Sequence, residues 1–371
     1  MANEIDKFLA ERIAAGDFPS AVYLVGERGE IKLHNALGNA VVEPETIPAK
    51  LDTIYDVASL TKVLVTGLLC AKALENGAVS LDTQPREMLG HVRRSDSTLR
   101  HLISHDSGLP VWRPFYLLVN DRSNILTEIL RTPTRVGDRM VTYSDLNFLM
   151  LTFLLEFIYG KPLDQVFADE VAVPLGLSST LFSPAPALRP RIAASEHGNV
   201  FEKLTCIAES YLAPTDTLTI ASKFRSDVIW GEVHDGNAHF MGGVSGHAGL
   251  FSTAKEVFKI AQQFLPDHTT LLRSETCELF DTNFTPGLNE HRSFSFQLAS
   301  TPDSTAGTRL SPQSFGHLGF TGTSLWIDPV KQRVYILLTN RTHNRQLPFE
   351  NINSVRRRFH DLANDILDQN S

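Results

Sequence analysis

Apolar residues recur at helical spacing near the N-terminus and then alternate with polar ones as in strands. An amphipathic helix is predicted over residues 4–15, ending at Gly16, from four apolar positions: Ile5, Phe8, Leu9 and Ile13. The segments 21–26 and 30–37 are rich in β-forming residues. A short polar connection, Glu27-Arg-Gly29, joins them and predicts a hairpin.

The C-terminal end repeats this arrangement. Segments 324–327 and 333–339 predict a second hairpin, which turns at Asp328-Pro329. A closing amphipathic helix is predicted from five apolar positions: Val355, Phe359, Leu362, Ile366 and Leu367. The two ends of the chain are therefore expected to supply the strands of one antiparallel sheet.

Helical patterns dominate the middle of the chain. One is expected from Leu60 to Leu74, and residues 80–214 hold several more between proline and glycine breaks. The segment 146–158 is apolar almost all round, which predicts a buried helix, and another helix is expected over 254–265. Six glycines between Gly231 and Gly249 indicate a turning loop, which is at the surface or at the rim of a site.

These patterns predict one α+β domain over residues 1–371. An antiparallel sheet flanked by the terminal helices would come from about 1–79 and 250–371, and a mostly helical subdomain from about 80–249 would be inserted into it.

Composition narrows the classes of partner. The chain has 371 residues, of which 42% are hydrophobic and 20% charged, with a net charge of -8 and a pI near 5.9. This acidic balance argues against nucleic-acid binding, and we interpret the basic run Arg356-Arg-Arg358 as a solvated helix face. Three cysteines, Cys70, Cys206 and Cys277, lack metal or redox spacing and are expected to be buried or free thiols.

No stretch approaches the roughly 20 apolar residues of a membrane span. The first residues also lack the pattern of a signal peptide. We therefore expect a cytoplasmic protein, or a periplasmic or secreted one if a leader has been removed. The oligomeric state is left open.

Candidate chemistry begins at Ser59-Leu-Thr-Lys62, where an apolar run passes into a helix pattern. A serine and a lysine three residues apart in a first helical turn share one face, and the helix dipole favours negative charge beside the serine. A second S-x-x-K, Ser252-Thr-Ala-Lys255, is interpreted differently. There Ser252 or Thr253 would cap the helix, and Lys255 would be solvated.

Two further motifs follow in order: Tyr143-Ser-Asp-Leu-Asn147 and His317-Leu-Gly-Phe-Thr-Gly-Thr323. Together with Ser59-Leu-Thr-Lys62 they resemble the serine β-lactamase and penicillin-binding-protein superfamily. The resemblance is closest to its class C-like branch, which includes family VIII-type carboxylesterases and D-aminopeptidase or DD-peptidase relatives. It runs from about residue 5 to about 365, and it implies the β-lactamase/transpeptidase-like fold.

The resemblance also implies roles. Ser59 would attack a carbonyl carbon, Lys62 would accept its proton, and Tyr143 would share that proton with the leaving group. The backbone N–H groups of Ser59 and Phe320 would form the oxyanion hole. Four further residues, with Phe320, would contact substrate: Asp145, Asn147, His317 and Gly319.

Three residues depart from the family pattern. Asp145 stands where class C members have asparagine, and a carboxylate there would keep Lys62 protonated unless it points elsewhere, which shifts the role of base toward Tyr143. His317 and Leu318 replace the lysine and threonine of K-T-G. A fixed charge and a hydroxyl that would hold a substrate carboxylate are therefore missing.

Other classes of protein fit the sequence less well. An α/β-hydrolase would need a G-x-S-x-G elbow, and a metallohydrolase would need more than the pair His101 and His105, so no metal or cofactor is expected. We predict a serine hydrolase that works through an acyl-enzyme on Ser59. It would be a carboxylesterase, with weak β-lactam hydrolysis alongside. The alternatives are an amidase acting on D-amino-acid or cell-wall peptides, and a non-catalytic binding or scaffold protein with the same fold.

Overall fold

The computed structural model describes residues 3–90, 97–134, 139–344 and 347–369. Its main element is a seven-stranded sheet of order β3-β2-β1-β10-β9-β8-β7, in which every neighbouring pair is antiparallel. The strands come from both ends of the chain: β1 Ser20–Glu27, β2 Glu30–Val41, β3 Ile47–Pro48, β7 Gln297–Leu298, β8 Phe315–Leu318, β9 Ser324–Asp328 and β10 Arg333–Thr339. Both predicted hairpins are present, as β1–β2 and β9–β10.

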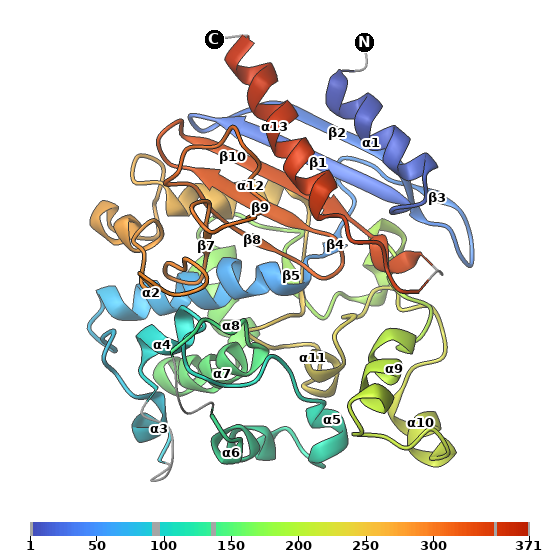
Figure 1. The fold of residues 1–371 in the computed structure, drawn as a ribbon, viewed down its shortest axis with the longest axis vertical. Helices are drawn as coiled ribbons and strands as arrows, with labels where there is room; N and C mark the ends of the chain where they lie inside the picture. Colours follow the sequence, from blue (N-terminus) through green and yellow to red (C-terminus); the bar gives the residue numbers. More distant parts are fainter. Residues whose placement is uncertain (1–2, 91–96, 135–138, 345–346, 370–371) are drawn as a thin grey trace.

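Both faces of this sheet are buried. Alternate residues of β1 belong to two different cores, with Tyr23 and Val25 on one side and Val22 and Leu24 on the other. The terminal helices α1 Glu4–Ala14 and α13 Asn353–Gln369 cover the first side, where they lie next to each other (Figure 1). The second side faces the helical part of the chain.

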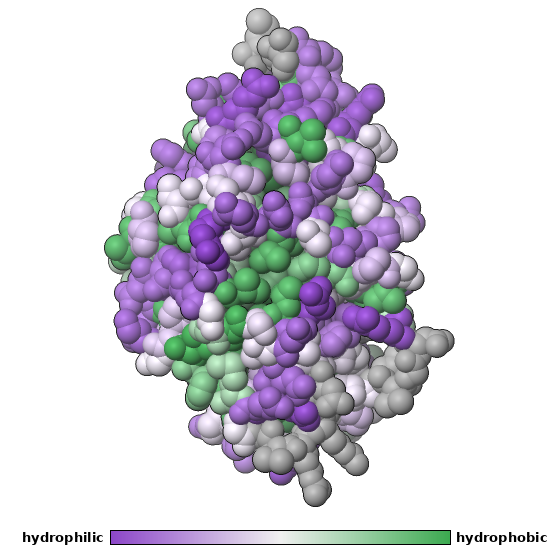
Figure 2. All heavy atoms as spheres, turned by 90° about the vertical axis from the view of Figure 1, so that its left-hand side faces the viewer, coloured by the Kyte–Doolittle hydropathy of each residue, from purple (hydrophilic) through white to green (hydrophobic). Residues whose placement is uncertain are grey.

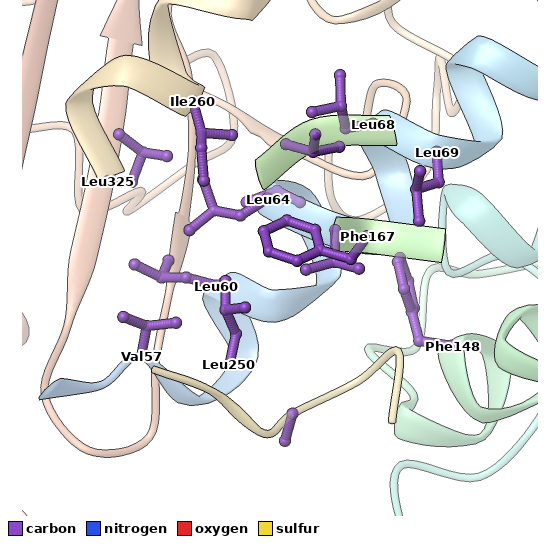
Figure 3. Close-up of a cluster of buried hydrophobic side chains, with 14 of the residues drawn as sticks. Val57, Leu60, Leu64, Leu68, Leu69, Phe148, Phe167, Leu250, Ile260 and Leu325 are labelled. Carbon is purple, nitrogen blue, oxygen red and sulfur yellow. The ribbon is translucent and has the colours of Figure 1, made fainter. Parts of the chain in front are cut away.

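The predicted helix at 60–74 is built in three pieces: a 3-10 turn η1 Ala58–Leu60, a π-helical stretch η2 Lys62–Gly67 and an α-helix α2 Leu68–Glu75. Leu60, Leu64 and Leu68 extend from this run into the second core (Figure 3). There they meet Leu325 of β9 and Phe167 of the helical part. The run that carries Ser59 is thus fixed by buried side chains along its length.

Helices fill the part of the chain predicted to be helical. They are α3 Pro85–Met88, α4 Leu99–Ile103, α5 Phe115–Leu118, α6 Ser123–Arg131, α7 Asp145–Tyr159, α8 Leu163–Phe167, η3 Ala168–Ala172, η4 Pro186–Arg191, α9 Val200–Ala208, α10 Thr217–Lys223 and α11 Gly236–Phe240. As predicted, α7 is buried along most of its length. The remaining helices are α12 Ala254–Ala261, η5 Gln262–Phe264, η6 Ser274–Leu279 and η7 Arg341–His343.

A small sheet, which the sequence pattern did not predict, lies between the two parts. It has the order β4-β6-β5 and consists of Tyr55–Asp56, Leu250–Ser252 and Leu181–Phe182. Because β4 immediately precedes η1, pairing of β4 with β6 fixes the start of the helical run at Ser59.

The outer surface carries both hydrophilic and hydrophobic residues. The side shown in Figure 2 is largely hydrophilic, with a hydrophobic area near its middle. Within the described ranges, no single helix is long and apolar enough to cross a membrane, and one pair that meets the test jointly, 145–159 with 163–172, is bent by 70°.

Candidate active site

Ser59 lies in the first turn of the helical run, as predicted. The preceding residue, Ala58, has a φ of +49°, a backbone conformation that is strained for a residue with a side chain. Its N–H donates to Asp56 Oδ1 at 2.8 Å, and the N–H of Val57 donates to the Leu250 carbonyl at 3.0 Å. These bonds hold the strained turn and direct Ser59 toward a cavity.

Lys62 is fully buried and reaches Ser59 as the spacing predicted. Its Nζ lies 3.0 Å from Ser59 Oγ, 2.9 Å from the carbonyl oxygen of His247 and 2.7 Å from Asp145 Oδ1. Burial lowers the pKa of Lys62, but the carboxylate of Asp145 and the hydroxyl of Tyr143 outweigh it, so the net direction is upward. The lysine is therefore an ammonium group in the resting site.

Tyr143 stands directly beside this pair. Its ring packs on His105 with centroids 4.6 Å apart, and Lys62 Nζ lies 5.0 Å from its ring centroid. Its hydroxyl contacts both Lys62 and Ser59. Burial raises the pKa of Tyr143 more than Lys62 lowers it, so the phenol keeps its proton. The expectation that the role of base shifts to Tyr143 therefore does not follow from this geometry.

Asp145 points at Lys62 and not elsewhere, so the departure from asparagine has the effect expected from the sequence. Asp145, Asp235 and His247 place one ligand atom each within 4.8 Å of one another. Asp235 Oδ1 is already bonded to His247 Nε2 at 2.9 Å, and Asp145 to the Lys62 ammonium. We interpret these side chains as the acidic surroundings of a buried lysine.

The turn after β8 closes over Ser59. Thr323 Oγ1 donates to the Val57 carbonyl at 3.0 Å, and Thr321 Oγ1 donates to the Asp56 carbonyl at 2.8 Å. Phe320 lines the cavity within this turn, and its N–H makes no hydrogen bond in the part of the chain that the structure describes. This position suits the second donor of the predicted oxyanion hole.

His317 is uncharged at its place in β8. Its Nδ1 donates to the Leu318 carbonyl oxygen at 2.8 Å, and only 4% of the residue is exposed. Burial, together with the charges of Lys62 and Arg292, holds the pKa of His317 well below its ordinary value. Leu318 also lines the cavity, so neither residue supplies the charge of a K-T-G lysine.

The structure does not support the prediction that Asn147 contacts substrate. Its side chain is fully buried, accepts a hydrogen bond from Ser107 Oγ at 2.6 Å and lies 3.4 Å from His105 Nδ1. On α7 it lies two residues beyond Asp145, and a helix turns by about 200° over that distance, so it faces the core. Its contacts support the segment around Ser107.

The second S-x-x-K has the structural role predicted for it. Thr253 Oγ1 caps α12 by accepting from the Glu256 N–H at 3.2 Å, and Lys255 is exposed. Ser252 is buried and bonded to Thr180 Oγ1 at 2.7 Å. No lysine approaches Ser252 among the contacts of the described residues.

A cavity of about 1030 Å³ opens at Ser59, and charged groups of both signs line it. The acidic ones include Asp235 and Glu202, and burial together with Asp235 raises the pKa of Glu202 to about 7. The lining also includes three arginines that the motifs did not indicate, namely Arg292, Arg341 and Arg356.

The interpretation of the basic run Arg356-Arg-Arg358 as a solvated face is wrong for Arg356. It is 5% exposed and its Nη2 donates to the carbonyl oxygens of Gly319 and Thr323 at 2.8 and 3.0 Å. A helical pattern alone did not distinguish it from its exposed neighbour Arg358.

Comparisons with known proteins agree with this geometry. The family described as Beta-lactamase matches residues 5–356. A relative from Escherichia coli (strain K12) named "Putative D-alanyl-D-alanine carboxypeptidase" is 30% identical over 375 residues, covering 92% of this chain and 82% of the relative.

Two solved structures share the fold at 20% identity and a TM-score of 0.72 each. One is "EstCE1, a hydrolase with promiscuous acyltransferase activity", with 97% of each chain covered. The other is a class C beta lactamase from Rhodobacter sphaeroides, with 99% of this chain and 100% of that chain covered. With its family match and its relatives, the chain belongs to the beta-lactamase family of serine hydrolases.

Proposed function

We propose that this hydrolase acts on neutral esters of small or medium acyl groups through an acyl-enzyme on Ser59. The observation that carries the choice of ester is the uncharged His317 followed by Leu318 at the cavity wall. A substrate carboxylate placed there would lose water and gain no charge from these two residues, whereas a neutral ester has less hydration to lose.

The proposed reaction follows the usual course of acyl transfer. Ser59 Oγ bonds to the carbonyl carbon, and the oxygen that becomes negative is held by the N–H groups of Ser59 and Phe320. The Tyr143 hydroxyl, in contact with Ser59 and Lys62, is placed to pass a proton to the departing alkoxide. Water then repeats the attack on the acyl-enzyme, releases the acid and restores the Ser59 hydroxyl.

Apolar side chains beside the oxyanion turn support binding of an acyl or alkyl group. Phe201 lies 4.9 Å and Phe349 6.0 Å from Phe320, measured between ring centroids, and all three line the cavity with Leu318. Rings that are half buried in a cavity gain free energy when an apolar group covers them, by about 25 cal/mol per Å².

A second candidate, hydrolysis of D-alanyl peptides, is favoured by a different observation. Arg341 and Arg356 both line the cavity, and among the described residues their guanidinium groups donate to backbone carbonyl and side-chain amide oxygens, with the Glu350 carboxylate as a nearby charge for Arg341. Burial lowers the pKa of Arg341 to about 10, and burial together with Arg341 lowers that of Arg356 to about 9. An anionic group would relieve this repulsion, and the Escherichia coli relative is named for a peptide substrate with a free carboxylate.

The test is a direct comparison of substrates. The purified chain is assayed with short p-nitrophenyl esters, a chromogenic cephalosporin and D-alanyl-D-alanine peptides, and Ser59 is probed with a fluorophosphonate. A preference for the esters supports the proposal, and a preference for the peptides supports the second candidate. If Ser59 does not react with the probe, a non-catalytic binding protein replaces both.

A further inference from the structure

The nitrogen of Lys62 has no lone pair available for the Ser59 proton. Four oxygen atoms surround it among the described residues: Asp145 at 2.7 Å, the His247 carbonyl at 2.9 Å, Ser59 at 3.0 Å, and the Tyr143 hydroxyl, which also contacts it. An ammonium group has three N–H bonds, so each proton is directed at one of these oxygens. Lys62 can accept the Ser59 proton only as it releases one of its own.

We propose that Asp145 receives this proton, so that Lys62 and Asp145 together act as the base for Ser59. The proposal rests on Ser59 being the nucleophile. As the bond from Ser59 Oγ to the carbonyl carbon forms, the Ser59 proton moves to Lys62 Nζ and a Lys62 proton moves to Asp145 Oδ1. The π electrons of the carbonyl move onto its oxygen, so the pair gains one positive charge and the oxyanion one negative charge.

Collapse of the intermediate reverses these transfers. The proton returns from Asp145 to Lys62, and Lys62 passes a proton through the Tyr143 hydroxyl to the leaving group. Every proton that leaves Ser59 thus reaches the departing alkoxide, and no external base is consumed.

The surroundings of Asp145 favour this role. Oδ1 has no hydrogen bond among the described residues besides its ion pair with Lys62, so a lone pair is free for a proton. Among the described residues, the ionisable groups that face Asp145 include Lys62 of η2, Tyr143, Asp235 before α11 and His247 before β6. Repulsion from the nearby Asp235 carboxylate is relieved when Asp145 accepts a proton.

The main rival is a mechanism in which Lys62 first loses its proton to water. The two routes differ in their dependence on pH. With Asp145 as acceptor, Lys62 must be protonated and Asp145 ionised, so the rate is level at neutral pH and falls in acid. With loss to water, the rate rises throughout the neutral range, because the pKa of Lys62 lies above its ordinary value of 10.5.

The rate at which a fluorophosphonate labels Ser59 distinguishes these routes without knowledge of the natural substrate. It is measured from pH 5 to 9 on the full chain and on Asp145→Asn, which removes the acceptor with little change in shape. Asp145→Glu retains a carboxylate. Asp169→Asn is the matched control, because Asp169 pairs with Lys161 at the same 2.7 Å but both side chains are about half exposed.

We expect nearly level labelling of the unmodified chain from pH 7 to 9. In Asp145→Asn the pH below which the labelling rate declines should rise by about one to three units. At pH 6 this variant should label at least about tenfold more slowly than the unmodified chain. Asp145→Glu should label faster than Asp145→Asn at pH 6, and Asp169→Asn should keep the original profile.

The proposal is overturned if labelling of the unmodified chain rises about tenfold per pH unit across this range. Faster labelling of Asp145→Asn at pH 6 would overturn it as well. Circular dichroism checks that the variants fold. If they do not fold, the pH dependence of labelling in the unmodified chain alone distinguishes the two routes. Absence of labelling at every pH would instead reject Ser59 as nucleophile, and with it the proposed function.

Discussion

Gly319 packs against the carbonyl oxygen of Val57 with no room for a side chain. A Cβ atom on residue 319 would lie 2.6 Å from this oxygen and would overlap Thr323 Oγ1. Because Val57 leads directly into the strained turn before Ser59, this contact sets the distance between Ser59, the proposed nucleophile, and the Phe320 N–H.

Gly319→Ala should therefore damage catalysis more than stability. The added methyl group must push the β8–β9 turn away from Val57, and loss of one oxyanion donor costs about 10²- to 10³-fold in kcat. Overpacking of this kind costs about 1–3 kcal/mol in the free energy of unfolding. Steady-state assays with a p-nitrophenyl ester and urea denaturation measure the two effects.

Gly160→Ala is the control for this substitution. Gly160 ends α7 in a left-handed conformation with a φ of +65° and open space around it. Alanine there should cost about 1 kcal/mol in stability and leave kcat unchanged. Equal losses of kcat in the two variants would show that Gly319 has no special place in the site.

The two S-x-x-K motifs give a second prediction. Ser59→Ala should lower kcat by roughly 10⁶-fold, as for other enzymes that lose their nucleophile. Ser252→Ala removes hydrogen bonds to Thr180 and to the Thr253 carbonyl, both away from Ser59, and should keep nearly full activity. Parallel assays of the two purified variants decide the matter, and similar activity in both would refute the assignment of Ser59.

The sequence predicted the local geometry of the site, because that geometry depends on short separations. Ser59 and Lys62 share one turn of one helical run, so their spacing alone brings Oγ and Nζ together. The β1–β2 and β9–β10 hairpins were likewise predicted from strands that are neighbours in the chain.

Features that depend on packing between distant segments were not predictable in the same way. Asn147 and Asp145 are two residues apart, and only the contact of α7 with η2 decides which of them faces Lys62. Arg356 looked like a solvated residue, because the turn at Gly319 that buries it lies 37 residues away. The approach of Asp235 and His247 to Lys62 arises from a glycine-rich stretch without regular periodicity.

A third prediction concerns acid stability and His360, which is fully buried. Its Nδ1 contacts the Thr305 carbonyl at 2.7 Å, and burial lowers its pKa to about 3. The unfolded chain binds a proton near pH 6.5 and the folded chain does not, so stability is lost as the pH falls from 6.5 toward 3.

At pH 5 the difference in the pKa of His360 between the folded and unfolded chains lowers the free energy of unfolding by about 2 kcal/mol. Replacement by glutamine removes the titration, so His360→Gln should lose less stability than the unmodified chain between pH 7 and pH 5. Urea denaturation at both values measures this. An identical pH dependence in the two proteins would mean that His360 is not held neutral.

The final prediction concerns selectivity between neutral and anionic substrates. His317 and Leu318 offer no charge to a substrate carboxylate, and a charge-assisted hydrogen bond at that place would contribute about 1.5–3 kcal/mol. The value of kcat/KM for a short p-nitrophenyl ester should therefore exceed that for a chromogenic cephalosporin. The double change His317→Lys with Leu318→Thr should narrow the ratio by about ten- to a hundredfold.

The outcome depends on whether another cation already holds the carboxylate. Arg341 lines the same cavity, and its Nε donates to the Phe320 carbonyl at 2.8 Å, so an anion bound there would lie close to the oxyanion turn. If the unmodified chain prefers the cephalosporin, Arg341→Gln should abolish that preference, and the ester proposal fails. The other outcome is that the unmodified chain prefers the ester and Arg341→Gln leaves the ratio of the two kcat/KM values unchanged. Arg341 then contributes equally to both substrates, so the missing lysine and threonine of the β8 motif account for the selectivity.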